Sequence, residues 1–143
     1  MLTQDTTVII IEQDDHVPVT LTEMVERISS GQELQVLSRD RSIKPGDVVN
    51  TRGSDSKDFV YIGTENHSVI LTPDHKVYEP VRKEWMSANM VSSLCYVLDS
   101  DNNHLPVVST HTISDKLSKK TITLTVSPGQ CFFANNILVH NER

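Results

Sequence analysis

The 143-residue sequence has few of the residues that mark several common protein classes. It contains only two cysteines, Cys95 and Cys131, which are too few for a disulfide scaffold and form no CxxC pair. Thirteen Lys and Arg residues against nineteen Asp and Glu residues give a net charge of −6. No basic excess is therefore available to bind nucleic-acid phosphates or an anionic membrane surface. No apolar run approaches the roughly 20 residues that span a bilayer.

The beginning of the sequence, MLTQDTTVIII, lacks the basic segment and the small-residue cleavage site of a secretory signal. The length leaves room for one domain, and 37% hydrophobic residues suffice for one core in a β-rich fold. We therefore expect a soluble, reduced, cytoplasmic monomer that binds neither nucleic acid nor a membrane.

One helix is expected near residues 20–31. Apolar side chains recur there at helical spacing, at Leu21, Met24, Val25 and Ile28. Thr20 and Glu23 have the spacing of a capping box, and Gly31 stands where a helix would end.

The rest of the sequence predicts about ten short strands, which makes the expected fold all-β. The expected strands are residues 6–11, 33–38, 47–52, 58–64, 68–72, 76–78, 93–98, 105–113, 121–127 and 131–139. Turn-like residues separate them. Residues 53–58 (GSDSKD) and 99–104 (DSDNNH) are expected to form solvated loops, and Ser-Pro-Gly at residues 127–129 a tight turn.

The chain end places His140 and Asn141 directly after the apolar run ILV. An asparagine amide can attack its own backbone carbonyl and close a succinimide, which breaks the following peptide bond. The attack is intramolecular, so proximity supplies much of the acceleration. A neighbouring imidazole can protonate the leaving amine. The two residues by themselves favour the simpler interpretation of a polar chain end.

The segment ILTPDH places Thr72 and His75 at a T-x-x-H spacing after an expected strand. This spacing lets a hydroxyl and an imidazole converge on one backbone amide. A T-x-x-H pattern also arises by chance, and a single histidine is more often structural.

Three segments taken together resemble the Hint (hedgehog/intein) family. They are the initial MLTQDTTV, the internal ILTPDH and the terminal FFANNILVHN, and they occur in the family's order. IKPGDVV at residues 43–49 resembles the family's xGDxV segment. The resemblance covers residues 1–141 at a length suited to a mini-intein without an inserted endonuclease, and it leaves 142–143 as downstream flank.

The resemblance implies a horseshoe-like all-β fold with pseudo-twofold symmetry that brings both ends of the domain to one site. It implies self-cleavage or protein splicing that acts on the chain's own flanking polypeptides and requires no cofactor. Position 1 carries the nucleophile in the family. Thr72 and His75 correspond to the groups that activate the N-terminal junction, and His140 and Asn141 to the C-terminal pair.

The sequence departs from the family pattern at several positions. Met1 stands where the family has Cys or Ser, and a thioether has no acidic proton with which to form an acyl intermediate. Glu142 stands where a downstream nucleophile is usual, as in A-type bacterial intein-like domains. Thr123 replaces a frequent Asp, and Gln130 and Cys131 replace a frequent His-Asn pair. We interpret Cys131 as a packing residue or a local turn contact.

Two alternatives stay open. The domain is an inert scaffold or interaction module, or it binds zinc through His75, Cys131 and His140. Zinc at these residues would inhibit processing, because it would occupy the catalytic imidazoles.

Processing requires residues far apart in the sequence to meet. We therefore predict that the two ends of the domain are neighbours, with the His75 ring beside the backbone of residue 1. Strand alternation points neighbouring side chains to opposite faces, so the last strand should end irregularly near residues 139–141. A hydrogen-bond donor should hold the Asn141 carbonyl oxygen there.

Overall fold

The computed structural model describes residues 1–39 and 46–141. Within these ranges most residues lie in β-strands, beside one α-helix and one short 3-10 helix, η1 (Ala88–Met90). This content confirms the expected all-β class with one short helix. The described part of the chain includes no helix that is both long and apolar enough to cross a membrane.

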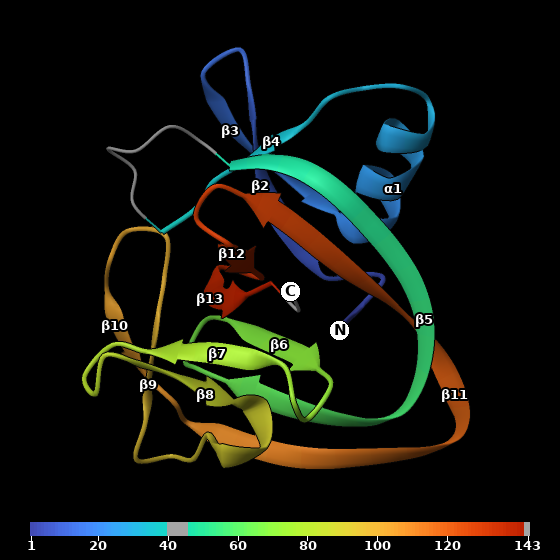
Figure 1. Cartoon of the computed structure of the whole chain (residues 1–143). Coiled ribbons are helices and arrows are strands. Elements are labelled where there is room, and N and C mark those ends of the chain that lie inside the picture. The colour runs from blue at the N-terminus through green and yellow to red at the C-terminus, as the bar shows by residue number, and fades with distance from the viewer. Residues whose placement is uncertain (40–45, 142–143) are drawn as a thin grey trace.

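The largest sheet has seven antiparallel strands in the order β11-β1-β6-β5-β4-β2-β3. Its strands are β1 (Leu2–Thr3), β2 (Thr7–Glu12), β3 (Asp15–Thr20), β4 (Gln35–Val36), β5 (Gly46–Gly63), β6 (Ser68–Leu71) and β11 (Ser109–Ser127). β5 and β11 contain 18 and 19 residues and pair along most of their length. In Figure 1 this long pair curves around the shorter strands as an arch, which gives the molecule its horseshoe-like outline.

A second sheet of four strands lies inside the arch, in the order β12-β13-β7-β8. Its strands are β7 (Lys76–Glu79), β8 (Glu84–Ser87), β12 (Cys131–Ala134) and β13 (Ile137–His140), and a separate hairpin joins β9 (Tyr96–Leu98) to β10 (His104–Pro106). Alternation gives the four-stranded sheet two buried faces. Val77, Phe132 and Val139 pack into the main core, whereas Tyr78, Phe133 and Leu138 belong to a second apolar cluster.

The predicted helix is present as α1 (Leu21–Ser29). Thr20 caps it, because its Oγ1 accepts a hydrogen bond of 3.1 Å from the Glu23 backbone N–H. Leu21 and Met24 are fully buried, as their spacing predicts.

Three predicted segments differ most from the observed elements. Residues 53–58 are not a loop but the middle of β5, where Asp55 lies opposite Lys120 in β11. Pairing with a long partner strand supplies the backbone hydrogen bonds that outweigh the turn-like composition. The predicted strand 105–113 is divided between β10 and β11, and the predicted strand 131–139 is divided between β12 and β13.

The second division has a local cause. Asn135 and Asn136 adopt positive φ angles of 47° and 66°, which asparagine tolerates better than most residues and which suit a two-residue hairpin turn. The predicted turn at residues 127–129 and the predicted hairpin loop at 99–104 are both present. The sequence did not indicate β1, β3 or β8.

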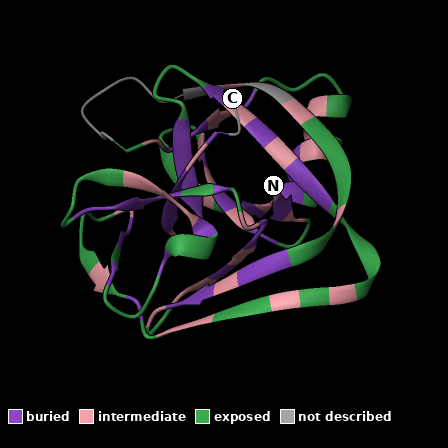
Figure 2. Ribbon diagram, turned by 60° about the horizontal axis from the view of Figure 1, so that its bottom comes forward, coloured by how far each residue is buried: buried purple, intermediate pink, exposed green. Residues whose placement is uncertain are grey.

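Buried residues gather on the inner strands, whereas exposed residues follow the outer parts of β5 and β11 (Figure 2). Part of the IKPGDVV segment, residues 43–45, and the expected flank, Glu142 and Arg143, lie outside the described residues.

Candidate active site

The backbone nitrogen of Met1 is held by two side chains from the turn between β6 and β7. It lies 2.8 Å from Thr72 Oγ1 and 2.7 Å from His75 Nδ1. Thr72 and His75 are 3% and 2% exposed, so both contacts form almost out of water. The T-x-x-H segment and the first residue therefore meet as predicted.

The turn geometry explains why this spacing works. The Thr72 N–H donates to the Met1 carbonyl over 2.9 Å, which fixes the first residue beside the end of β6. The His75 N–H then donates to the Thr72 carbonyl over 3.1 Å, and this closes one turn. The turn brings the hydroxyl and the imidazole to the same nitrogen atom.

The other ring nitrogen of His75 reaches the opposite end of the domain. Its Nε2 lies 2.8 Å from the His140 carbonyl oxygen. A carbonyl only accepts, so Nε2 must carry the hydrogen, and Nδ1 of the neutral ring is left as an acceptor facing Met1. One buried imidazole thus contacts both ends.

His140 is the last residue of β13. Its Nδ1 lies 2.6 Å from the carbonyl oxygen of Asn141 and therefore acts as the donor in that hydrogen bond. Its ring meets the Trp85 ring edge to face, with centroids 4.8 Å apart and planes at 83°. The donor expected at the Asn141 carbonyl is thus the neighbouring histidine itself.

Asn141 is the first residue beyond β13 and is 5% exposed. Its N–H donates to the Gln130 carbonyl over 2.8 Å. Its side chain forms a pair of bonds with the Val126 backbone: Nδ2 donates to the carbonyl over 2.9 Å, and Oδ1 accepts from the N–H over 3.2 Å. The strand ends here, as predicted, and β11 holds the asparagine amide in place.

Three contacting residues escaped the sequence analysis: Trp85, which meets His140, and two residues of β11. Thr121, only 1% exposed, donates from Oγ1 to the Met1 Sδ over 3.2 Å. Val126 holds Asn141 through its backbone, so its side-chain identity carries no signal. Thr121 stands two residues before Thr123, and alternation places both on the same face of β11. Of these two threonines, the sequence singled out only Thr123.

Cys131 belongs to the second apolar cluster and is 3% exposed, with its Sγ 3.3 Å from Ser38 Oγ. This agrees with its interpretation as a packing residue with a local contact. In residues 1–39 and 46–141, no three His, Cys, Asp or Glu side chains are placed to hold a metal ion. The trio of His75, Cys131 and His140, named above as an alternative zinc site, is not among such groups in these residues.

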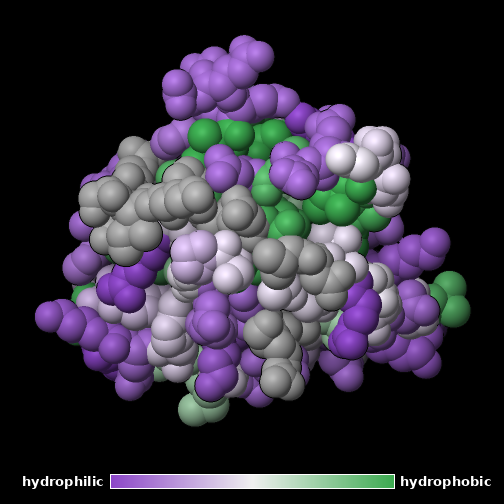
Figure 3. All heavy atoms as spheres, turned by 45° about the horizontal axis from the view of Figure 1, so that its top comes forward, coloured by the Kyte–Doolittle hydropathy of each residue, from purple (hydrophilic) through white to green (hydrophobic). Residues whose placement is uncertain are grey.

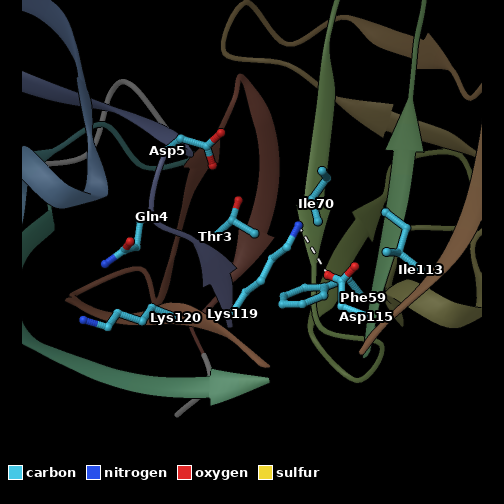
Figure 4. A pocket seen from close by; sticks show the side chains of 9 residues that line it. All are labelled: Thr3, Gln4, Asp5, Phe59, Ile70, Ile113, Asp115, Lys119 and Lys120. Carbon is cyan, nitrogen blue, oxygen red and sulfur yellow. Dashed lines mark ion pairs between the residues drawn. The ribbon is translucent and has the colours of Figure 1, made fainter. Parts of the chain in front are cut away.

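Two hollows of the surface lie away from these residues. One of about 400 Å³ is bordered by Thr3, Phe59, Asp115 and Lys119 (Figure 4). The last two form an ion pair, with 3.3 Å between Lys119 Nζ and Asp115 Oδ2. Another of about 510 Å³ is bordered by His16, His67 and their neighbours. On the face in Figure 3, hydrophobic side chains occupy smaller areas between hydrophilic ones. Neither hollow includes a residue of the candidate site.

The sequence matches no protein-family model and no curated protein. The structure, however, is similar to those of inteins. The VidaL intein shares 14% identity at a TM-score of 0.78, over 98% of this chain and 95% of that one. A bacterial intein-like domain from Clostridium thermocellum shares 18% sequence identity at a TM-score of 0.74, and the match covers 99% of both chains. A DnaB intein from Synechocystis sp. PCC 6803 shares 15% sequence identity at a TM-score of 0.80, and the match covers 99% of this chain and 98% of that one.

These likenesses establish the Hint/intein fold over almost the whole chain. At such low sequence identity these likenesses show the fold alone, and the chemistry depends on the residues of the site.

Proposed function

We propose that this chain is an intein-like autoprocessing domain, or a bacterial intein-like domain of the A type, whose site is arranged to break the peptide bonds at its own two ends and whose first step is disabled by Met1. The observation that carries the proposal is the position of His75, whose two ring nitrogens contact the Met1 nitrogen and the His140 carbonyl. A side chain that joins two chain ends 65 and 74 residues away is expected where both ends react in one site.

The N-terminal contacts favour bond breakage at residue 1. In a chain with an upstream flank, the Met1 nitrogen is an amide with one hydrogen, yet two acceptors surround it. The same nitrogen released as an amine has hydrogens for both Thr72 and His75. The site therefore matches the leaving amine better than the intact amide, and such differential binding lowers the barrier.

The identity of residue 1 decides whether this step occurs. A Cys at this position would attack the preceding carbonyl, forming a C–S bond while the C–N bond breaks and a proton moves to the amine. Met1 has no such proton, so we propose that the first step is disabled in this chain.

The C-terminal step uses Asn141. Its Nδ2 forms a bond to its own carbonyl carbon, the bond to residue 142 breaks, and the proton lost from Nδ2 is balanced by one gained at the leaving amine. Negative charge develops on the Asn141 oxygen, to which the His140 Nδ1 donates. We assign His140 to stabilising this oxygen rather than to protonating the amine, because that is the atom it contacts.

The proposed chemistry needs only side chains of this chain and no cofactor, and its partners are the flanking polypeptides. The domain is proposed to act as a monomer without nucleic acid or a membrane. Zinc bound to His75 or His140 would inhibit both steps by occupying nitrogens that the reaction uses.

Met1 also favours a second candidate function, an inert Hint-fold scaffold or interaction module. Without a nucleophile at residue 1 the upstream junction is stable, and only the C-terminal step remains. Two origins of Met1 are to be distinguished. Met1 is either a start residue in place of a cysteine or a substitution that removes the nucleophile.

The test is a Met1→Cys protein with folded domains on both sides, compared with the Met1 parent. We expect thiol to release the upstream domain from the Met1→Cys protein alone, as seen by mass. Prolonged stability of both junctions in dithiothreitol, with circular dichroism typical of the folded parent, would support the scaffold instead.

A further inference from the structure

Trp85 lies in β8, the edge strand of the four-stranded sheet, and contacts His140 at the C-terminal junction. It is the only tryptophan of the chain and is half-buried in β8. Its ring meets His140 at 4.8 Å and Tyr78 at 5.1 Å, with planes at 83° and 63°. Tyr78 is its direct cross-strand partner in β7.

Tyr78 is itself held firmly. It is 5% exposed, and Arg39 both lies over its ring at 4.1 Å and donates from Nη2 to its hydroxyl over 2.8 Å. The ring contacts therefore run in a row from Arg39 through Tyr78 and Trp85 to His140. A row anchored in a buried tyrosine gives Trp85 little freedom to move away from His140.

The hydrogen bond from His140 to Asn141 restrains one ring atom, and this bond alone does not determine the tilt of the imidazole plane. An edge-to-face contact with a second ring restrains that tilt, because such contacts have a preferred geometry. Donors aimed at a developing oxyanion are effective only when held in place before the reaction. The orientation of His140 thus depends on Trp85.

We propose that Trp85 is a positioning residue for His140 and so sets the rate of the C-terminal step. The proposal rests on the proposed function, since it concerns the same asparagine cyclisation. Trp85 does not touch the reacting atoms and acts only through the histidine.

The first experiment measures release of a downstream domain in the Met1→Cys background. Trp85→Ala should slow release about tenfold, the equivalent of ~1.4 kcal/mol, whereas Trp85→Phe should stay within about threefold of the parent because it keeps a ring against His140. Tyr61→Ala is the matched control. Tyr61 is a half-buried strand residue whose ring also lies beside a histidine, His111, at 5.6 Å.

Release at the parent rate in Trp85→Ala would overturn the proposal, and so would equal slowing in Tyr61→Ala. Thermal unfolding of each variant separates a local effect from general destabilisation. If Trp85→Ala does not fold, the comparison of Trp85→Phe with a Trp85→Leu protein takes its place, and equal rates in that pair would count against the proposal.

The second experiment does not depend on cleavage. The emission of Trp85, the only tryptophan of the chain, depends on the rings packed against it. At one pH, His140→Ala should change this emission relative to the parent, and the control His104→Ala, at an exposed position, should not. Equal emission from all three proteins would overturn the contact. Absence of release in every protein, with this difference intact, would overturn the proposed function and leave the Trp85–His140 contact standing.

Discussion

The two ends of the domain differ in which groups they hold for the proposed chemistry. At the N-terminal end, Thr72 and His75 hold the backbone nitrogen, but the side chain of Met1 has nothing with which to attack. At the C-terminal end, the attacking side chain of Asn141 is present and bound to β11, with the His140 donor on its carbonyl. The groups that hold a junction are therefore separate from the atom that reacts, and the second can be absent without disturbing the first.

The two ends also share one residue. His75 hydrogen bonds to the first residue with one nitrogen and to the carbonyl of the penultimate domain residue, His140, with the other. A change at either end therefore reaches the same imidazole, which gives the two proposed half-reactions a direct structural link.

The largest expected effect concerns Asn141, because the comparison of the two ends is invalid if the C-terminal end does not react through this residue. Asn141→Ala should abolish release of a downstream domain, since no succinimide can form. Electrophoresis and mass of the released domain measure this. Asn66→Ala, at an exposed turn, is the matched control and should behave like the parent. Undiminished release in Asn141→Ala would mean hydrolysis or a contaminating protease.

Loss of the His140 donor to the Asn141 carbonyl should slow release at the same junction without abolishing it. His140→Ala should reduce the release rate by about 10²–10³, because it removes the hydrogen-bond donor to the developing charge on the Asn141 oxygen and water replaces such a donor only poorly. Thiol cleavage upstream in a Met1→Cys protein should change far less. A comparable loss upstream would show that the ends are not separable at His140.

Loss of the His75 side chain should slow cleavage at both ends, but to different extents. In the Met1→Cys background, His75→Ala should reduce upstream cleavage by about 10²–10³, because it removes a group that contacts the scissile nitrogen. Downstream release should fall about tenfold, since the lost Nε2 bond to the His140 carbonyl is one neutral hydrogen bond worth about 1–1.5 kcal/mol. His104→Ala, in the exposed β9–β10 hairpin, is the control.

Equal losses at the two ends in His75→Ala, with circular dichroism like that of the parent, would contradict this gradation. They would place His75 at the centre of both reactions.

The smallest effect should come from outside both ends. Glu79 is 2% exposed; burial raises its pKa, but N–H bonds from Arg82, Tyr96 and Val81 together with the Arg82 charge leave that pKa below the ordinary 4.5. A lowered pKa stabilises the folded state above pH 4.5, and this contribution is lost as the pH falls through the folded value.

Glu79→Gln should therefore lower the free energy of unfolding near neutral pH by about 1–3 kcal/mol and flatten its decline in acid. Denaturant unfolding at several pH values measures both effects. Release at the two ends, assayed under conditions where the variant is folded, should change equally. A selective loss at one end would give Glu79 a role in the site.

Much of the site could be read from the sequence because its reactive groups come in short, local patterns. The T-x-x-H spacing closes one turn, so Thr72 and His75 had to meet. The pair His140-Asn141 is adjacent, so a contact between imidazole and carbonyl was within reach. The helix α1 was predictable for the same reason, since its cap and its apolar spacing are local.

Features that depend on a distant strand were predicted less well. Residues 53–58 read as a loop because only the pairing with β11 makes them a strand. Thr121 and Val126 lie in a strand that was predicted, but their contacts with Met1 and Asn141 arise from folding alone. Trp85 gave no signal, because its role depends on β7 and β8 placing its ring beside His140.

The sequence by itself thus determined the chemical groups at the two ends, the missing nucleophile at Met1 and the all-β class, because side-chain chemistry, short spacings and strand propensities are properties of the local chain. The tertiary structure alone decided that His75 joins both ends and that β11 holds the asparagine amide. The residues joined by these hydrogen bonds are 15 to 74 positions apart in the sequence. Such bonds are made only when strands fold back on one another, and no local pattern encodes the distance between their atoms.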